Sequence, residues 1–308
     1  MKRKEWTNAT MTAAGLATAA GLVLWVSGAD GASGADGADS SSPDSVVLTG
    51  IVRDFRERTE PGGHDDFEQR PDAGFGHYTG NLASELDADG KPVFTGLGKK
   101  VRSEWHDSSG RNINPAMYDP ERGDTAGRWG PSDAGGIGSA EGFRQWYRDV
   151  PGVNASMPID ITLVRQPNSD VYTFDDKETP EYVATGGFFP INGQLFGNSA
   201  GENKNFHFTY ELATEFMYNR GTGQVFTFTG DDDVWVFIDG RLVIDIGGVH
   251  SAVSQTIDLD RLDWLADGQT HSLKFFFAER HRTQSNFRID TTLNLRNAQL
   301  PRVSGMFD

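Results

Sequence analysis

Three consecutive aspartates, Asp231, Asp232 and Asp233, form the group of side chains with the clearest chemical potential. They lie between two expected strands, at 224–229 and 234–238. Neighbouring side chains of a strand point to opposite faces, so adjacent carboxylates serve one ion only where the backbone departs from the pleat. Clustered carboxylates repel one another, and calcium, which takes about six to eight oxygen ligands, would offset that repulsion. The alternative is a solvated acidic turn that caps a strand.

A second polar group, Glu279, Arg280, His281 and Asn286, follows the apolar stretch 271–278. It falls in an expected loop between two strands, and such loops often carry binding sites. Glu279 and Asn286 are candidates to supply further oxygens to the ion. Arg280 and His281 are candidates to donate hydrogen bonds to sugar oxygens. An internal salt bridge between Arg280 and one of the aspartates is the alternative.

Four further residues are candidates for contact with a ligand: Asp245, His250, Trp105 and Trp129. Asp245 and His250 follow the expected hairpin. Imidazole is a poor calcium ligand, so a loop-bracing role is favoured for His250, with contact to sugar hydroxyls as its candidate binding role. Trp105 and Trp129 lie in Gly-rich, polar surroundings and are expected to stack on sugar faces.

The elements that must position these side chains are strands. Apolar and polar residues alternate in several stretches separated by Gly and Asp turns, a pattern typical of a sandwich or barrel. The expected strands are 46–52, 159–164, 205–212, 224–229, 234–238, 241–246, 256–259, 271–278 and 286–295. The stretch 234–238 is apolar on both faces, which predicts a central strand. Asp239 and Gly240 then supply a tight hairpin turn.

The region from Arg53 to about Gly142 shows short apolar runs broken by Gly, Asp, Asn and Pro. This pattern predicts long irregular loops with a few strands. One stretch, 140–147, places three aromatic side chains on one face at helical spacing and predicts a short helix. The predicted fold class is therefore all-β, an antiparallel β-sandwich with long irregular loops and one or two short helices.

The first residues indicate export. A positive start, Lys2-Arg3-Lys4, precedes an apolar stretch from Met11 to Val26 and then small residues. This order is typical of a secretory signal peptide, with an uncleaved anchor as the alternative. The predicted organisation is a signal peptide or anchor at 1–29, a flexible Gly/Ala/Ser/Asp linker at 30–45, the folded domain at 46–297 and a short tail at 298–308. We expect a secreted or cell-surface protein that contacts membrane only through an uncleaved N-terminal segment.

Composition excludes several functions. The 308 residues carry a formal net charge of −16 and contain no cysteine. Disulfides, thiol catalysis and thiolate metal sites are therefore excluded. The acidity argues against nucleic acid, because a phosphate backbone needs stripes of Lys and Arg. The sequence shows no nucleophile elbow, HExxH motif, P-loop or dinucleotide fingerprint in its required context, so we expect no enzymatic activity.

Five ordered blocks resemble the fibro-slime family. They are TGIVRDF with HDDFE (49–68), FRQWYRDVPGVN (143–154), FFPINGQLFGN with NFHFTYEL (188–212), GDDDVWVFIDGRLVIDIGGVH (230–250) and FFFAERHRTQSNFRIDTTL (275–293). The resemblance covers most of the chain after residue 46. It implies a surface or slime-matrix protein.

The block around Asp231 also resembles the wider protective-antigen-type (PA-fourteen) superfamily of β-sandwiches. That resemblance implies an extracellular adhesion or glycan-binding module. It further implies a cis peptide between two Asp residues that both ligate calcium, at Asp231 and Asp232 in this sequence. Asp233 stands where many relatives have Gly.

We therefore expect a calcium-dependent carbohydrate-binding or adhesion module whose partner is an extracellular glycan or polysaccharide. The expected calcium ligands come from Asp231, Asp232, Asp233, Glu279 and Asn286. A structural matrix protein that binds surface-matrix proteins is the alternative, and a glycoside hydrolase is the least favoured.

Overall fold

A computed structural model of the chain describes residues 43–298. The predicted signal peptide or anchor, most of the predicted linker and residues 299–308 of the predicted tail lie outside this range. The strands are β1 (Ser45–Phe55), β2 (Tyr78–Thr79), β3 (Gly98–Ser103), β4 (Trp105–His106), β5 (Asn112–Ile113), β6 (Arg128–Asp133), β7 (Asn154–Arg165), β8 (Tyr172–Asp175), β9 (Phe208–Met217), β10 (Val225–Gly230), β11 (Asp233–Ile238), β12 (Arg241–Ile246), β13 (Val253–Asp258), β14 (Thr270–Glu279), β15 (Phe287–Thr291) and β16 (Arg296–Asn297). The helices are α1 (Ala140–Arg144) and α2 (Pro180–Thr185), with short 3-10 turns at Pro115–Met117, Pro120–Arg122 and Leu259–Arg261.

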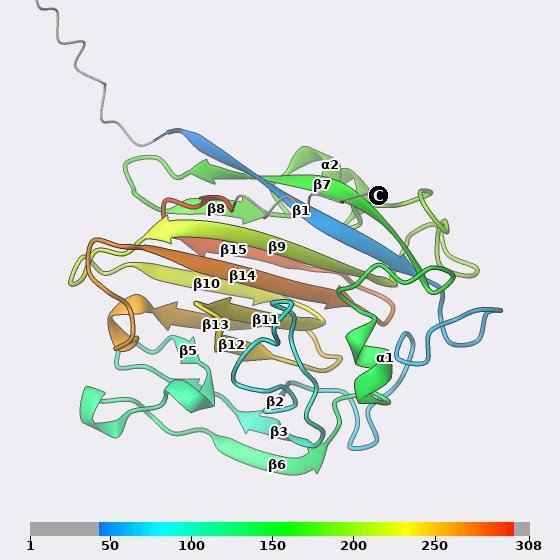
Figure 1. Cartoon of the computed structure of the whole chain (residues 1–308), viewed down its shortest axis with the longest axis horizontal. Coiled ribbons are helices and arrows are strands. Elements are labelled where there is room, and N and C mark those ends of the chain that lie inside the picture. The colour runs from blue at the N-terminus through cyan, green and yellow to red at the C-terminus, as the bar shows by residue number, and fades with distance from the viewer. Residues whose placement is uncertain (1–42, 299–308) are drawn as a thin grey trace, which may run out of the picture. The chain divides into compact units, whose positions relative to one another are not determined.

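Most strands join one antiparallel sheet with the order β12-β11-β14-β9-β1-β7-β8-β15-β10-β13, and β16 pairs with β9 (Figure 1). The sheet folds over on itself into two layers, so that β14 in one layer faces β10 and β15 in the other. Phe277 of β14 lies 5.2 Å from Phe287 of β15, and Phe275 lies 5.4 Å from Phe228 of β10, measured between ring centroids. These rings are buried in the core between the two layers. The predicted all-β sandwich is confirmed.

The strand β11 is central, as its apolar pattern predicted. It pairs with β12 on one side and β14 on the other, and every residue in it is buried. Val236 packs in the main core, whereas Trp235 packs in a second cluster with Phe143 and Trp146. Burial on both faces therefore fixes the start of β11, where the aspartates lie, against two layers of packed side chains.

The long region between β1 and β7 covers the outer face of β11 and β14. Two small sheets, β2-β3-β6 and β4-β5, are its regular parts, and the rest is loop, as predicted. The predicted helix forms as α1, and the aromatic residues Phe143, Trp146 and Tyr147 are buried in the second cluster. Neither α1 nor α2 in the described part of the chain is long and apolar enough to cross a membrane.

Asp54 near the end of β1 gives the fold a pH dependence. Its carboxylate is buried and accepts hydrogen bonds from the backbone N–H of Phe196 and from Asn205 Nδ2, both at 2.7 Å. Burial raises the pKa of Asp54 to about 7, despite these hydrogen bonds. The fold therefore favours the protonated carboxyl, so Asp54 contributes stability below about pH 4 that is lost as pH rises to about 7.

We expect Asp54→Asn to remove that dependence. The free energy of unfolding of the natural protein should fall relative to that of the variant by up to about 4 kcal/mol between pH 4 and pH 7, since one pKa unit corresponds to about 1.4 kcal/mol. Urea unfolding at a series of pH values measures the difference. Parallel pH profiles for the two proteins would contradict the assignment.

Candidate functional site

The candidate site is built where β10 ends and β11 begins. The peptide bond between Asp231 and Asp232 is cis, as the superfamily resemblance predicted. Gly230 just before it leaves room for β15, because a Cβ there would lie 2.1 Å from the backbone oxygen of Asn286. The close approach of β10 to Asn286 thus requires glycine at position 230.

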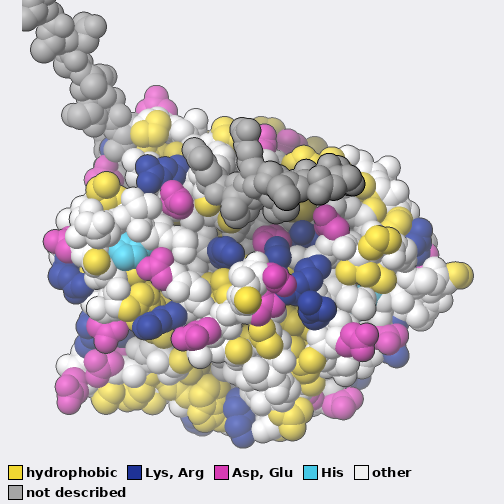
Figure 2. All heavy atoms as spheres, in the orientation of Figure 1, with side chains coloured by type: hydrophobic (Ala, Val, Ile, Leu, Met, Phe, Trp, Pro, Cys, Tyr) yellow, Lys and Arg dark blue, Asp and Glu magenta, His cyan; other side chains and the backbone are white. Residues whose placement is uncertain are grey.

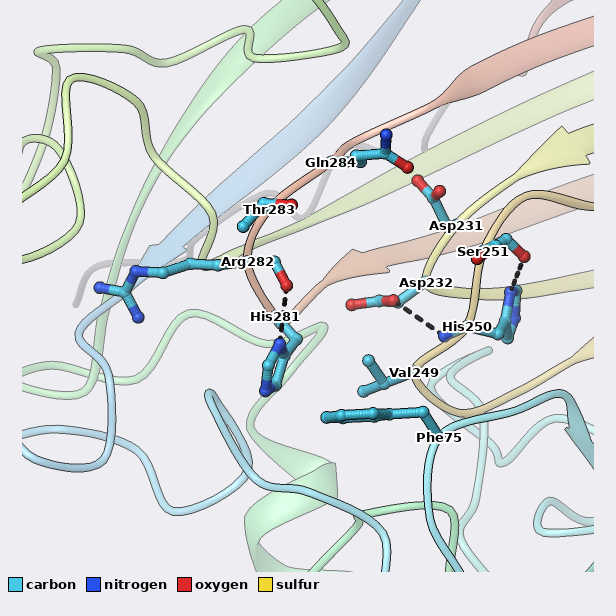
Figure 3. A pocket seen from close by; sticks show the side chains of 10 residues that line it. All are labelled: Phe75, Asp231, Asp232, Val249, His250, Ser251, His281, Arg282, Thr283 and Gln284. Carbon is cyan, nitrogen blue, oxygen red and sulfur yellow. Dashed lines mark hydrogen bonds between the residues drawn. The ribbon is translucent and has the colours of Figure 1, made fainter.

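Asp231 and Asp232 line one open cavity of about 230 Å³ (Figure 3). The turn after β12 contributes His250, and the loop after β14 contributes His281 and Gln284. Phe75 closes another side of the cavity from the region before β2. The cavity therefore collects two carboxylates, two imidazoles, an amide and an aromatic ring from four separate parts of the chain.

The two carboxylates differ in how well their oxygens are satisfied. Asp231 accepts hydrogen bonds from the backbone N–H and the side-chain Nδ2 of Asn286, at 2.6 and 2.7 Å. Asp232 accepts longer bonds from the backbone N–H groups of His250 and Arg280, at 3.3 and 3.2 Å. Weakly paired carboxylate oxygens remain available to a further partner. Of the two residues, Asp232 therefore has the greater remaining capacity to accept hydrogen bonds or to bind a cation.

Several described residues have a buried polar atom without a hydrogen-bond partner, and among them Glu279 is the carboxyl with both oxygens unpaired. Its side chain is fully buried, and neither carboxylate oxygen has a hydrogen-bond partner. Burial, and then the charges of Asp232 and Asp231, raise the pKa of Glu279 well above its ordinary value. Burial likewise raises the pKa of Asp232 well above its ordinary value. Carboxyls in this state take up either a proton or a cation.

Oxygen donors of this kind fit a hard divalent cation. The carboxylates of Asp231, Asp232 and Glu279 influence one another electrostatically. The Ser285 hydroxyl and the His281 backbone N–H lie near Glu279 and lower its pKa, but neither reaches hydrogen-bond geometry with its oxygens. Asn286 donates through Nδ2, which leaves its side-chain oxygen for another partner. These oxygens are of the types that calcium prefers, carboxylates and a side-chain carbonyl.

Asp233 and Arg280 form an internal pair, which corrects two predictions. The Arg280 guanidinium is fully buried and donates from Nε to Asp233 Oδ2 at 2.5 Å and from Nη2 to Asp233 Oδ1 at 3.1 Å. The backbone N–H of Gly248 donates to the same Oδ1 at 2.6 Å. Asp233 therefore has no free oxygen for a cation, and buried Arg280 does not reach a sugar. The alternative predicted for Arg280, an internal salt bridge, is confirmed.

The two predicted histidines do reach the cavity. His281 and His250 both line it, and His250 Nδ1 lies 2.9 Å from the backbone oxygen of Ser251, to which it donates (Figure 3). Burial, followed by the charge of His77, lowers the pKa of His250 to about 3, so this imidazole is neutral. With Nδ1 as the donor, Nε2 is an acceptor, and it has no partner.

Three other predicted ligand contacts lie elsewhere. Asp245 is buried in β12, where Thr79 Oγ1 and Trp235 Nε1 donate to it at 2.6 and 3.0 Å. Trp105 is buried and packs at 4.1 Å against Trp129, between ring centroids. Trp129 is half-exposed and lines a different, apolar groove of about 480 Å³. These three residues therefore stay outside the cavity of Asp231 and Asp232.

Phe75 and Gln284 are cavity residues that the sequence did not single out. Phe75 belongs to the irregular region before β2, and Gln284 to the loop after β14. No strand or helix period covers either residue. The flanking glycines Gly74 and Gly76, both with positive φ, are the local signal that Phe75 lies in a shaped loop.

A second cluster that the sequence did not predict lies behind the loop after β14. Among the described residues, Glu57, Glu68 and His207 bring possible ligand atoms within 4.8 Å of one another. The Arg282 guanidinium pairs with Glu57 and lies 2.6 Å from Glu68. Burial would raise the pKa of Glu68, but the hydrogen bond from His207 and the charges of His281 and Arg282 lower it to about 2. Arg282 thus neutralises the cluster and anchors the loop.

Residues 207–302 match the family model described as "PA14 domain". Protein psiD of Dictyostelium discoideum is 42% identical over 159 residues, which are 49% of this chain and 29% of psiD. Protein psiR of the same organism is 39% identical over 267 residues, which are 82% of this chain and 22% of psiR. The chain thus spans less than a third of the length of these relatives. Among solved structures, the "PA14 sugar-binding domain from RTX adhesin" is 11% identical, with a TM-score of 0.24, over 81% of this chain and 90% of that one.

The matched residues 207–302 contain every strand from β9 to β16, and with them the cis-linked Asp231–Asp232 pair. The match with psiR reaches well beyond this segment, which is consistent with the resemblance of the remaining blocks to the fibro-slime family. Residues 207–302 of this chain therefore match the PA14 domain family.

Proposed function

We propose that the chain is a calcium-dependent carbohydrate-binding or adhesion module of a secreted or surface protein, without catalytic activity. The observation that carries the proposal is the buried carboxylate of Glu279, which lacks any hydrogen-bond partner and lies within electrostatic reach of Asp231 and Asp232. A buried unpaired charge is costly, and a cation bound at the edge of an open cavity would stabilise it.

Different residues of the cavity would bind the ion and the glycan. Asp231, Asp232 and Glu279 would hold calcium, with Asn286 contributing its side-chain oxygen. Calcium, when bound, supplies open coordination positions to hydroxyl oxygens. The amide of Gln284 is a hydrogen-bonding side chain that the cavity offers to further hydroxyls, whereas Nδ1 of His250 is paired with Ser251 and its Nε2 is buried.

The placement of the carboxylates supports binding over hydrolysis. A glycosidase flanks the scissile bond with two carboxyl groups. Asp231 and Asp232 are instead adjacent in sequence, and Glu279 is fully buried. We expect the purified protein to release no reducing sugar from polysaccharides to which it binds.

Calcium should stabilise the fold. At a free concentration about 100 times its dissociation constant, a ligand that binds only the folded state raises the free energy of unfolding by about 2.7 kcal/mol. Thermal unfolding in calcium, in magnesium and in chelator measures the effect, and calcium is expected to raise the melting temperature most. Equal melting temperatures in all three conditions would refute the cation site.

A glycan array probed with and without calcium tests the recognition step. We expect binding to particular glycans in calcium and none in chelator. Binding that persists in chelator, or binding to surface-matrix proteins alone, would favour a structural matrix protein over the proposed lectin-like function.

A further inference from the structure

We propose that Phe75 forms the apolar wall of the binding cavity, and that the bound unit is a neutral pyranose held between this ring and the Asp231–Asp232 corner. This inference rests on the proposed function and adds the sugar class and a specificity-determining residue. Sugar rings present an apolar C–H face as well as hydroxyls, so a site for them combines an aromatic surface with polar groups.

The loop that carries Phe75 is attached to the wall of the cavity. The backbone N–H of Gly76 donates to the oxygen of Val249 at 2.7 Å. Tyr78 and Gly247 exchange two backbone hydrogen bonds, at 2.7 and 2.8 Å. Val249 itself lines the cavity and leads directly to His250. The turn after β12 thus holds the loop of Phe75 beside the acidic corner, although the two are far apart in sequence.

The residues just before Phe75 in the same loop are also held in place by hydrogen bonds. The Tyr78 hydroxyl donates to the oxygen of Gly74 at 2.6 Å, and Lys100 Nζ donates to the oxygen of Ala73 at 3.0 Å. Lys100 Cε would lie 2.5 Å from a Cβ at Gly76, where φ is 154°. This loop is therefore built around Phe75, and a ligand would not have to order it. Such preorganisation increases affinity.

The Phe75 ring is presented to the cavity and not to the core. The residue is 47% exposed, although it lines the cavity. His281 meets the ring edge-on at 4.9 Å between centroids, and the Arg70 guanidinium carbon lies 5.3 Å from the ring centroid. In Figure 3 the ring is seen edge-on, with one face toward Val249 and the side of the cavity where Asp232 lies.

The charges around the cavity favour a neutral sugar. Arg280 is buried and paired with Asp233, and the Arg282 guanidinium is paired with Glu57 and Glu68. Arg70 approaches the ring but does not line the cavity. Arg282 lines the cavity, but its guanidinium is engaged by Glu57 and Glu68, so the lining side chains offer no free guanidinium to a sugar carboxylate. With calcium bound, the carboxylates of Asp231, Asp232 and Glu279 would still exceed the charge of the ion, so a uronic acid would meet repulsion that a neutral hexose does not.

The test compares Phe75→Ala and Phe75→Trp with the natural protein. The probes are methyl pyranosides of neutral hexoses and of a uronic acid, titrated in saturating calcium, and calcium alone is titrated separately. We expect Phe75→Ala to weaken the preferred neutral glycoside about tenfold or more while calcium affinity changes less than twofold. Phe75→Trp should restore binding. Leu97→Ala, which removes a side chain that is 72% exposed and lines the other groove, is the matched control and should change nothing.

The outcomes separate this inference from the proposal on which it rests. If the natural protein binds neither calcium nor any glycoside, the proposed function fails. If the natural protein binds neutral glycosides in calcium and Phe75→Ala binds them equally well, the assignment of Phe75 is overturned while the proposed function stands. Tighter binding of the uronic acid than of every neutral glycoside would overturn the sugar class.

Discussion

Replacement of Asp232 by Asn is expected to weaken calcium binding roughly 100-fold and to abolish calcium-dependent glycan binding with it. The backbone N–H of His250 donates to Asp232 Oδ1 and that of Arg280 to Oδ2, so Asn keeps an oxygen for one of these donors and loses the other hydrogen bond. It also removes one negative charge beside Glu279, and this charge is the main loss for calcium. Calorimetric titration of calcium measures the loss.

The same substitution should have the opposite effect on the calcium-free protein. Burial, together with the charges of Asp233 and Asp231, opposes ionisation of Asp232, although the charge of Arg280 favours it. Removing a buried and weakly paired charge is neutral or stabilising. In chelator at neutral pH, we therefore expect Asp232→Asn to melt at the same temperature as the natural protein or higher.

Asp170→Asn is the matched control for this experiment. Its carboxylate side chain is 82% exposed, and within residues 43–298 it pairs only with Arg165 on the surface. The same chemical change at that position should alter neither calcium affinity nor the melting temperature. If Asp232→Asn kept full calcium affinity, the acidic corner would not be the cation site.

The second large expected effect is a loss of stability on substitution of Arg280. Arg280→Met should lower the free energy of unfolding by about 3–5 kcal/mol, because it leaves the buried carboxylate of Asp233 without its partner. Arg280 also donates to the backbone oxygens of Gly135 and Gly136, at 2.9 and 3.2 Å, and its guanidinium lies 5.1 Å from the Trp146 ring. The variant thus loosens the long loop region from β14. Chemical unfolding in chelator measures the cost apart from any effect of calcium.

A double variant separates the buried charge from the loss of packing. Combining Arg280→Met with Asp233→Asn removes both charges, and Asn retains an oxygen for the Gly248 N–H. We expect the double variant to be more stable than Arg280→Met alone. Simple addition of the two single effects would show that the Arg280–Asp233 pair has no coupling energy.

Much of the fold was accessible from the sequence because it depends on local periodicity. The doubly apolar stretch 234–238 became β11, and Asp239 and Gly240 both have positive φ in the turn that follows, as a tight hairpin requires. The predicted return strand has the bounds of β12. Such patterns identify strands because a residue's face in a strand follows from its position alone.

The site was only partly accessible, since its members meet through tertiary contacts. The cluster of three aspartates was identified by residue type and spacing, and the Asp231–Asp232 pair by the resemblance to the PA-fourteen superfamily, whereas Asp233 was assigned to the wrong partner. Asp233 begins β11, and its side chain points to the buried arginine. Phe75 carries no periodic signal, because its position depends on hydrogen bonds to the distant turn at Gly247 and Val249.

The attachment of the Phe75 loop to the turn after β12 has a consequence for how relatives of this chain diversify. The acidic corner lies within residues 207–302, which match the PA14 model, and the aromatic wall lies outside them. Under the proposed function, substitutions in the early loop would change ligand preference without altering the residues proposed to bind calcium. Chimaeras that exchange only this loop between relatives should then transfer glycan selectivity without transferring calcium affinity.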